Sequence, residues 1–218
     1  MYLIIILKIN VYIKINMKIL NLNIFQIIFA IDLIFIAIIR IYFGKHRLIT
    51  KYKISINPII ERINSYLVSF GMIYFPLMNI LFGYFDKFYI EIPNIFKIIS
   101  SVILTADIIL FYLSHKDLAD NWSPFLEIKD KQKLIKTGIY KYIRHPMYLS
   151  MWIFSIFEGF VLSNYFIGIF GIVTWANLYF VRVSNEEKMM LDIFGEEYEK
   201  YIENSGRLFP KILKMKKL

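Results

Sequence analysis

The residues best suited to chemistry lie in two short polar stretches in the second half of the chain. The first ends in the run Arg144-His145-Pro146, and proline here is typical of the first turn of a helix. His145 then falls at or near the N-cap, where backbone N–H groups and the helix dipole attract a carboxylate. On physical grounds alone, Arg144 and His145 are more readily explained as interfacial anchors within a belt of tyrosines at a membrane surface.

The second stretch places Arg182 four residues before Glu186, so that both fall on one face of a helix. A planar guanidinium suits a substrate carboxylate, and the Glu186 carboxylate suits a ligand's amine or ribose hydroxyls. Two simpler explanations stay open. One is an exposed ion pair worth under about 1 kcal/mol. The other is a capping box of Ser184 and Glu187 at the start of a helix.

The composition indicates the class of protein that carries these stretches. Of 218 residues, 58% are hydrophobic and the mean hydropathy is +0.54, which indicates a membrane protein rather than a soluble domain. The net charge of +9 is typical of cytoplasmic loops in such a protein, so we expect no nucleic-acid partner. The chain has no cysteine, and its three histidines lack metal-ligand spacing, so we expect no metal.

Long apolar runs predict an all-α, polytopic membrane protein with about five transmembrane helices. The first three spans are expected at residues 20–43, 66–85 and 95–113, with a kink at Pro76. Residues 147–181 would form a helix of about 50 Å, longer than a bilayer core of about 30 Å. They are therefore expected to form a hairpin that turns at Ser163-Asn164. This gives an N-terminal part of three spans (1–115) and a ligand-binding core (116–218).

The basic residues predict how the chain lies in the membrane. They gather in 44–65, 115–146 and the tail from Arg182, whereas 86–94 and the hairpin turn are poor in them. The positive-inside rule then places the C-terminus in the cytoplasm and the N-terminus outside. Residues 1–19 fit this less well, and Met17 offers an alternative start.

The tail is expected to continue as an amphipathic helix. Apolar residues recur every three or four positions, at Met190 or Leu191, Phe194, Tyr198 and Tyr201. We expect this helix to rest on the membrane surface or on the loop before the fourth span.

Taken together, these motifs resemble the isoprenylcysteine carboxyl methyltransferase family. Residues 132–140 and the run Arg144-His145-Pro146-Met147-Tyr148 are similar to one of its motifs. Arg182, the pair Glu186-Glu187 and the run Phe194-Gly195-Glu196-Glu197-Tyr198 are similar to its tail. The resemblance covers nearly half the chain. Ser150 departs from it, since glycine is common there, and is expected to narrow the lipid entrance.

The resemblance implies a binding site for S-adenosyl-L-methionine built from both polar stretches. Glu186 would bind the cofactor, Arg182 would bind the substrate, and both are expected to be catalytic. The other cofactor-binding residues that the resemblance implies are Gln132, Lys133, Leu134, Ile135, Tyr140, His145, Pro146, Met147 and Tyr148.

The predicted function is methyl transfer to a carboxylate on a lipophilic, isoprenylcysteine-like substrate that enters from the bilayer. The enzyme would lie among membrane lipids, in the plasma or inner membrane if the chain is bacterial, with a cytoplasmic catalytic face. Three alternatives stay open: a phospholipid N-methyltransferase, an NADPH-dependent membrane reductase and a non-enzymatic membrane subunit.

Overall fold

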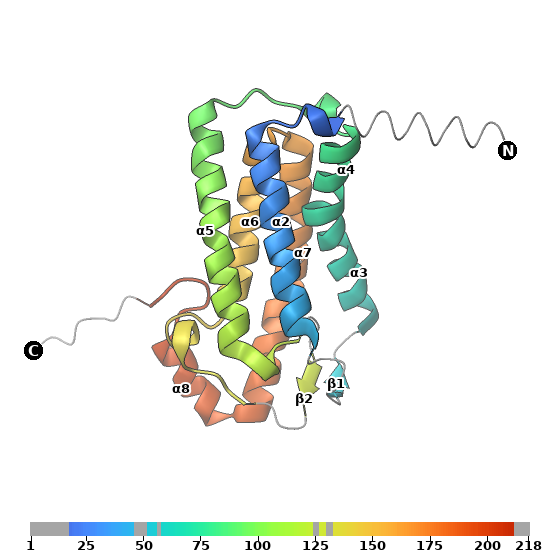
Figure 1. Cartoon of the computed structure of the whole chain (residues 1–218). Coiled ribbons are helices and arrows are strands. Elements are labelled where there is room, and N and C mark those ends of the chain that lie inside the picture. The colour runs from blue at the N-terminus through green and yellow to red at the C-terminus, as the bar shows by residue number, and fades with distance from the viewer. Residues whose placement is uncertain (1–17, 46–51, 56–57, 124–126, 130–132, 212–218) are drawn as a thin grey trace, which may run out of the picture.

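The computed structural model describes residues 18–45, 52–55, 58–123, 127–129 and 133–211. Within them, long helices run side by side as a bundle (Figure 1). A two-stranded antiparallel sheet, β1 (Tyr52–Ser55) with β2 (Glu127–Lys129), adds to the expected all-α fold at one end of the bundle. The helices are α2 (Ile24–Gly44), α3 (Pro58–Ser69), α4 (Phe75–Phe82), α5 (Asn94–Leu118), α6 (Pro146–Leu162), α7 (Tyr165–Phe194) and α8 (Glu196–Asn204).

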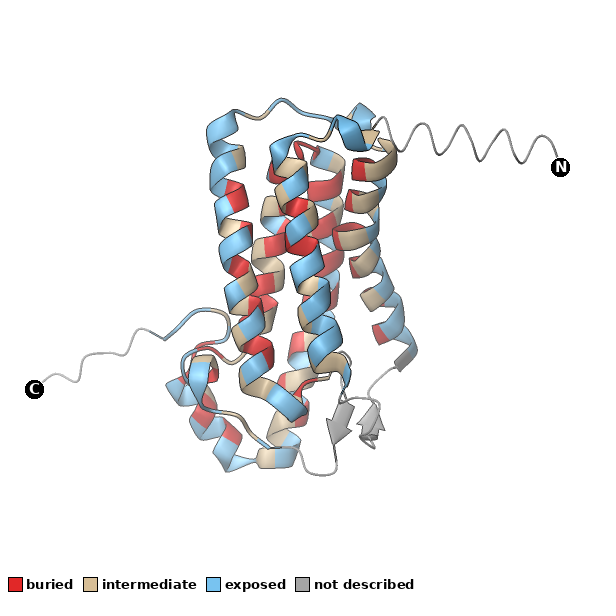
Figure 2. Cartoon of the chain, viewed as in Figure 1, coloured by how far each residue is buried: buried red, intermediate tan, exposed pale blue. Residues whose placement is uncertain are grey.

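The bundle is that of a polytopic membrane protein. Four described helical segments are long and apolar enough to cross a membrane: Ile24–Gly44, Ile59–Phe82, Asn94–Asn121 and Tyr165–Phe194. The fifth apolar helix, α6, is shorter, with 17 residues. Apolar side chains such as Ile34 and Ile38 are exposed, while Phe29 and Leu33 are buried. Figure 2 shows that exposed and buried residues occur together along each long helix of the bundle. This confirms the predicted membrane fold.

The hairpin predicted at Ser163-Asn164 is present. Ser163 has a positive φ of 53° and ends α6, and the Asn164 side chain caps α7 by accepting from the backbone N–H of Ile167. The two helices approach closely at Gly159 and Gly168, where a Cβ on Gly159 would lie 2.6 Å from the Gly168 Cα. Small residues therefore allow the tight packing of α6 against α7.

Pro76 interrupts the second span, as expected. A π-helical turn (Phe70–Tyr74) precedes it, closed by a hydrogen bond from the Phe75 N–H to the Phe70 carbonyl. Proline has no N–H to give to a regular α-helix, and a π turn is one way to accommodate this. The helical segment begins at α3, earlier than predicted.

The helix boundaries near the C-terminus differ from the prediction. The second arm of the hairpin was expected to end near 181, but α7 continues to Phe194. The expected continuous helix through Met190 and Tyr201 is wrong, because Gly195 takes a φ of +50° and separates α7 from α8. The amphipathic stripe is confirmed on α8, where Tyr198 and Tyr201 are buried.

Connections with few basic residues meet at one end of the bundle. Tyr89 forms a β-bridge with Asn164, and the Ile90 N–H donates to the Ser163 carbonyl at 2.9 Å. Lys18 pairs with Asp86 at 2.7 Å at the same end. The strands β1 and β2, which lie in sequence between α2 and α3 and between α5 and α6, are at the opposite end together with α8 (Figure 1). Which end faces the cytoplasm stays a prediction, as does the division at residue 115; residues 1–17 lie outside the described residues.

Three acidic residues of the spans point into the bundle. Asp32 accepts from the Thr105 hydroxyl at 3.2 Å, and Asp107 accepts from the Ser150 hydroxyl at 2.7 Å. Glu158 is fully buried beside Gly171, where an added Cβ would clash with its carboxyl. These three carboxyl groups therefore face the interior of the bundle rather than lipid.

Candidate functional site

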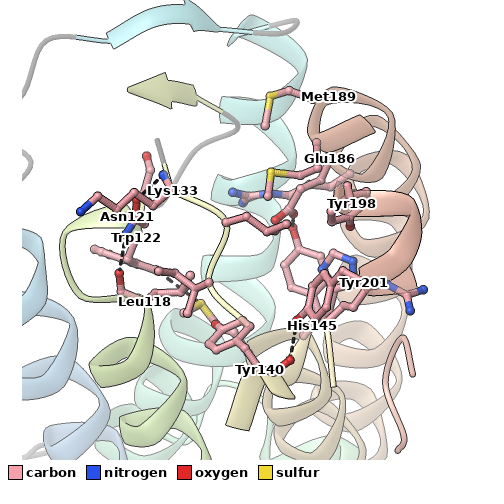
Figure 3. Close-up of a pocket in the computed structure, with 18 residues that line it drawn as sticks. Leu118, Asn121, Trp122, Lys133, Tyr140, His145, Glu186, Met189, Tyr198 and Tyr201 are labelled. Carbon is pink, nitrogen blue, oxygen red and sulfur yellow. Dashed lines mark hydrogen bonds between the residues drawn. The ribbon is translucent and has the colours of Figure 1, made fainter. Parts of the chain in front are cut away.

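A pocket enclosing about 860 Å³ opens at the sheet-bearing end of the bundle. Its walls come from the end of α5, the segment before α6, and helices α6, α7 and α8. Trp122 and Leu118 face Glu186 and Tyr198 across the hollow (Figure 3). The lining residues are Leu118, Asn121, Trp122, Ser123, Lys133, Leu134, Ile135, Tyr140, Arg144, His145, Met147, Tyr148, Arg182, Glu186, Met189, Met190, Tyr198 and Tyr201.

Both predicted polar stretches contribute to this pocket. The predicted residues in its lining are Lys133, Leu134, Ile135, Tyr140, His145, Met147, Tyr148, Arg182 and Glu186. Pro146 is outside the lining and instead begins α6, with His145 at the N-cap as expected. Gln132 lies outside the described residues. Residues more than 50 positions apart in sequence thus share one pocket.

Glu186 and Arg182 are joined to the pocket wall through Tyr148. The Tyr148 hydroxyl donates to Glu186, and the Arg182 guanidinium carbon lies 5.9 Å from the centre of the Tyr148 ring. Arg182 also forms an ion pair with Glu61 of α3 at 3.3 Å, and the two side chains are only 13% and 8% exposed. The explanation of Arg182 as a member of an exposed surface ion pair is therefore wrong.

Glu187, the neighbour of Glu186, is the centre of a separate charge cluster. Its carboxylate accepts from Arg144 Nη2 at 3.1 Å, Arg207 Nε at 3.1 Å and His145 Nε2 at 3.3 Å. The bond to Glu187 raises the pKa of Arg207 above its usual value. The capping-box explanation is wrong, because Ser184 and Glu187 lie inside the continuous helix α7.

Backbone hydrogen bonds hold the same segments together. The Arg144 N–H donates to the Gly206 carbonyl at 2.8 Å, and the His145 N–H donates to the Arg207 carbonyl at 3.0 Å. The side chains of Arg144 and His145 are 7% and 5% exposed, so the interfacial-anchor explanation is wrong for both. The cluster instead fixes the start of α6, where the His145 ring stacks on Tyr148.

Three tyrosines join α8 to the pocket. The Tyr201 hydroxyl donates to the Tyr140 carbonyl at 2.6 Å, and the Tyr140 hydroxyl donates to the Ser114 carbonyl at 3.1 Å. This confirms that the C-terminal helix packs on the segment before α6. Burial raises the pKa of Tyr201 to about 12 and the pKa values of Tyr140 and Tyr198 well above the usual value. All three phenols therefore stay neutral near pH 7.

Several lining residues were not among the predicted site residues. The Asn121 side chain accepts a hydrogen bond from the Lys133 N–H at 3.0 Å and so fixes the backbone of the segment before α6. Trp122 packs on His115 with ring centres 4.8 Å apart. The apolar stripe indicated that Tyr198 and Tyr201 are buried, but no sequence signal placed Asn121 at the pocket.

A second cavity, enclosing about 930 Å³, adjoins the first within the spanning helices. The two share Trp122, Ser123, Met147, Tyr148 and Arg182 in their linings. The remaining walls of the second cavity are Arg40, Arg62, Ser65, Tyr66, Val68, Ser69, Met151, Trp175 and Leu178. The two cavities thus meet at Tyr148 and Arg182.

Comparison with known proteins agrees with this geometry. The profile of the isoprenylcysteine carboxyl methyltransferase family matches residues 98–192, which run from α5 almost to the end of α7. The match includes the first motif together with Arg182, Glu186 and Glu187, and it ends before the run that starts at Phe194. Over these residues the chain is similar to this family. Its members are carboxyl O-methyltransferases that use S-adenosyl-L-methionine as methyl donor. The matched region leaves out α2, α3, α4 and α8.

Curated relatives match over part of their length. The chain is 35% identical over 77 residues to a protein-S-isoprenylcysteine O-methyltransferase of Dictyostelium discoideum, covering 34% of this chain and 32% of that protein. It is 32% identical over 75 residues to the Homo sapiens protein of that name, and this alignment covers 34% of this chain and 26% of the human protein. The chain therefore spans about a third or less of these relatives. The fold was also compared with a solved structure of a eukaryotic intramembrane Ras methyltransferase. The aligned part covers 73% of this chain and 55% of that chain, with 22% sequence identity and a TM-score of 0.49.

Proposed function

We propose that this protein is an integral-membrane methyltransferase that esterifies a carboxylate on a lipophilic acceptor, with S-adenosyl-L-methionine as methyl donor. One observation carries the proposal. A polar pocket with the Glu186 carboxylate on its wall meets, at Tyr148 and Arg182, a cavity that lies among the spanning helices. A water-soluble donor and a lipid acceptor would each reach this junction from their own side.

The polar pocket fits the methyl donor. The Glu186 carboxylate would bind a hydroxyl or ammonium group of the donor, and Tyr148 orients it by donating a hydrogen bond. Aromatic and methionine side chains on the walls, such as Trp122, Tyr198 and Met189, would cover the adenine and the sulfonium. When bound, S-adenosyl-L-methionine supplies an electrophilic methyl group on a positively charged sulfur.

Arg182 is suited to orient the acceptor. Its guanidinium lies at the junction and would hold an acceptor carboxylate through charge-assisted hydrogen bonds. A carboxylate is already ionised at neutral pH, so the formation of a methyl ester moves no proton and needs no general base. Catalysis then depends on alignment, which can contribute about 7–11 kcal/mol, and on the exclusion of water.

The same features favour this function over its alternatives. An amine acceptor would be repelled by the arginines of the second cavity and would need a base. A nicotinamide-dependent reductase would not require an arginine at the junction. We infer a cytoplasmic catalytic face, because the basic connections lie at the pocket end of the bundle. The acceptor class, an isoprenylcysteine-like lipid, is proposed from the names of the relatives.

Calorimetric binding of S-adenosylhomocysteine to the detergent-purified protein tests the donor site. We expect micromolar binding that Glu186→Gln weakens at least tenfold, while wild-type protein shows no binding of NADPH. Matched binding by wild type and Glu186→Gln would contradict the role of Glu186. Binding of NADPH instead would favour the reductase alternative, and binding of neither ligand by a folded sample would favour a non-enzymatic subunit.

A further inference from the structure

The second cavity carries more positive charge than its partners neutralise. Three arginines line it: Arg40 from α2, Arg62 from α3 and Arg182 from α7. Arg182 is paired with the buried carboxylate of Glu61. Among the residues that the structure describes, no carboxylate forms an ion pair with Arg40. Arg40 and Arg182 line the same cavity and carry the same charge.

We propose that Arg40 is a second acceptor-binding residue, which binds the acceptor's carboxylate together with Arg182. This inference rests on the proposed function. Like charges around a cavity with walls of low dielectric constant concentrate anions. Because Glu61 already offsets the charge of Arg182, a carboxylate at the junction needs a further cation to balance it, and Arg40 supplies one.

The position of Arg40 also fits a lipid that is anionic at one end only. Arg40 lines a third cavity of about 440 Å³, deeper in the bundle, which shares Val68, Ser69 and Met151 with the second. Apolar side chains of α2, α3, α5, α6 and the π-helical turn form most of its walls, and Asp107 also lines it. Arg40 therefore stands where a charged head and an apolar chain would join. It lies outside residues 98–192, so the family profile assigns it no role.

The simpler explanation is an interfacial anchor. Arg40 is four residues before the end of α2 and is exposed, so its long side chain could extend to the membrane surface. Lys45 follows the same helix end, is exposed and is absent from the linings of all three cavities. A role in anchoring predicts similar effects for the two residues, whereas a role in binding predicts an effect of Arg40 alone.

The test is ligand binding in nanodiscs of neutral phosphatidylcholine. The probes are an N-acetyl-S-farnesylcysteine with a free carboxylate and its uncharged methyl ester. We expect Arg40→Gln to weaken binding of the carboxylate at least tenfold and to leave ester binding and S-adenosylhomocysteine binding within about twofold. Arg40→Lys should restore part of the loss, and Lys45→Gln should have no effect.

Several results would overturn the inference. The first is an equal loss of binding for the carboxylate and the ester probe in Arg40→Gln. The second is a loss of carboxylate binding in Lys45→Gln as large as that in Arg40→Gln. The third is unchanged carboxylate binding in Arg40→Gln. If Arg40 binds phospholipid headgroups instead, Arg40→Gln would reduce retention of phosphatidylglycerol and leave probe binding intact, which also overturns it. Arg40-dependent binding of the carboxylate without any methyl transfer would support the inference and contradict the proposed function. If the protein transfers methyl groups and the KM for the acceptor is unchanged in Arg40→Gln, the proposed function would be supported and the inference about Arg40 contradicted.

Discussion

Two charged regions flank the same turn of α7, and they differ in how completely their charges are paired. Around Glu187, two arginines and a histidine converge on one buried carboxylate, and backbone hydrogen bonds join the segments that carry them. Around Arg182, three arginines line a cavity beside the single carboxylate of Glu61. The first region is satisfied by the protein itself, whereas we propose that an anionic ligand completes the second.

This comparison explains why adjacent glutamates have different roles. Glu187 faces the start of α6 and the segment after α8, so it fixes the walls of the pocket. Glu186 is one residue further round the helix and faces the pocket through Tyr148. In the proposed function, two adjacent residues of the same type thus separate the structural and the ligand-binding roles.

The largest effect is expected for Glu187→Gln. It leaves Arg144 and His145 buried without a negative partner, and breaking a buried ion pair from one side costs about 3 kcal/mol or more. Thermal or denaturant unfolding in detergent measures this loss. The matched variant Glu186→Gln should lose under about 1 kcal/mol. Equal losses of stability in the two variants would contradict the division into a structural Glu187 and a ligand-binding Glu186.

Arg182→Gln is expected to reduce kcat/KM for methyl transfer about 100-fold and to leave S-adenosylhomocysteine binding nearly unchanged, because it removes one partner of a charged contact. The loss of Arg182 also leaves Glu61 buried without that partner. The double variant Glu61→Gln/Arg182→Gln removes this second effect. A double variant that is stable and fully active would contradict an acceptor-binding role.

A smaller effect is expected for Tyr148→Phe. The variant keeps the ring that stacks on His145 and removes only the hydroxyl that donates to Glu186. A hydrogen bond to a charged group contributes about 1.5 kcal/mol, so binding of S-adenosylhomocysteine should weaken about tenfold. Calorimetry with unchanged unfolding stability would locate the effect in the pocket. A loss of stability without a change in binding would assign Tyr148 to the packing instead.

The smallest effect is expected for Arg207→Gln. The Arg207 side chain is 49% exposed, and Arg144 and His145 still pair with Glu187 when it is removed. We expect a loss of under about 1 kcal/mol in the free energy of unfolding. A loss as large as that of Glu187→Gln would show that the cluster depends on its exposed member.

The sequence predicted features that depend on local patterns. A 35-residue apolar run interrupted by Ser163-Asn164 predicted the hairpin, and Pro146 predicted the start of α6. The family resemblance predicted half of the pocket lining, because its motifs correspond to the two segments that meet there.

Features that depend on distant contacts were not predicted. The end of α7 was placed near 181, because Arg182, Glu186 and Glu187 read as the edge of an apolar run. In the fold these groups have partners on α3, on α6 and before α6, so the helix continues past them. Arg40 lies more than 140 residues before Arg182, and no local pattern indicates that they line one cavity.

The central claim is that the junction at Tyr148 and Arg182 transfers a methyl group to a lipid carboxylate. The most direct test is transfer of a labelled methyl group from S-adenosyl-L-methionine to N-acetyl-S-farnesylcysteine by the protein in nanodiscs. The account predicts a base-labile labelled methyl ester, which Glu186→Gln and Arg182→Gln abolish or strongly reduce. Absence of ester formation by folded wild-type protein that binds both ligands, or ester formation that is unaffected by both variants, would contradict it.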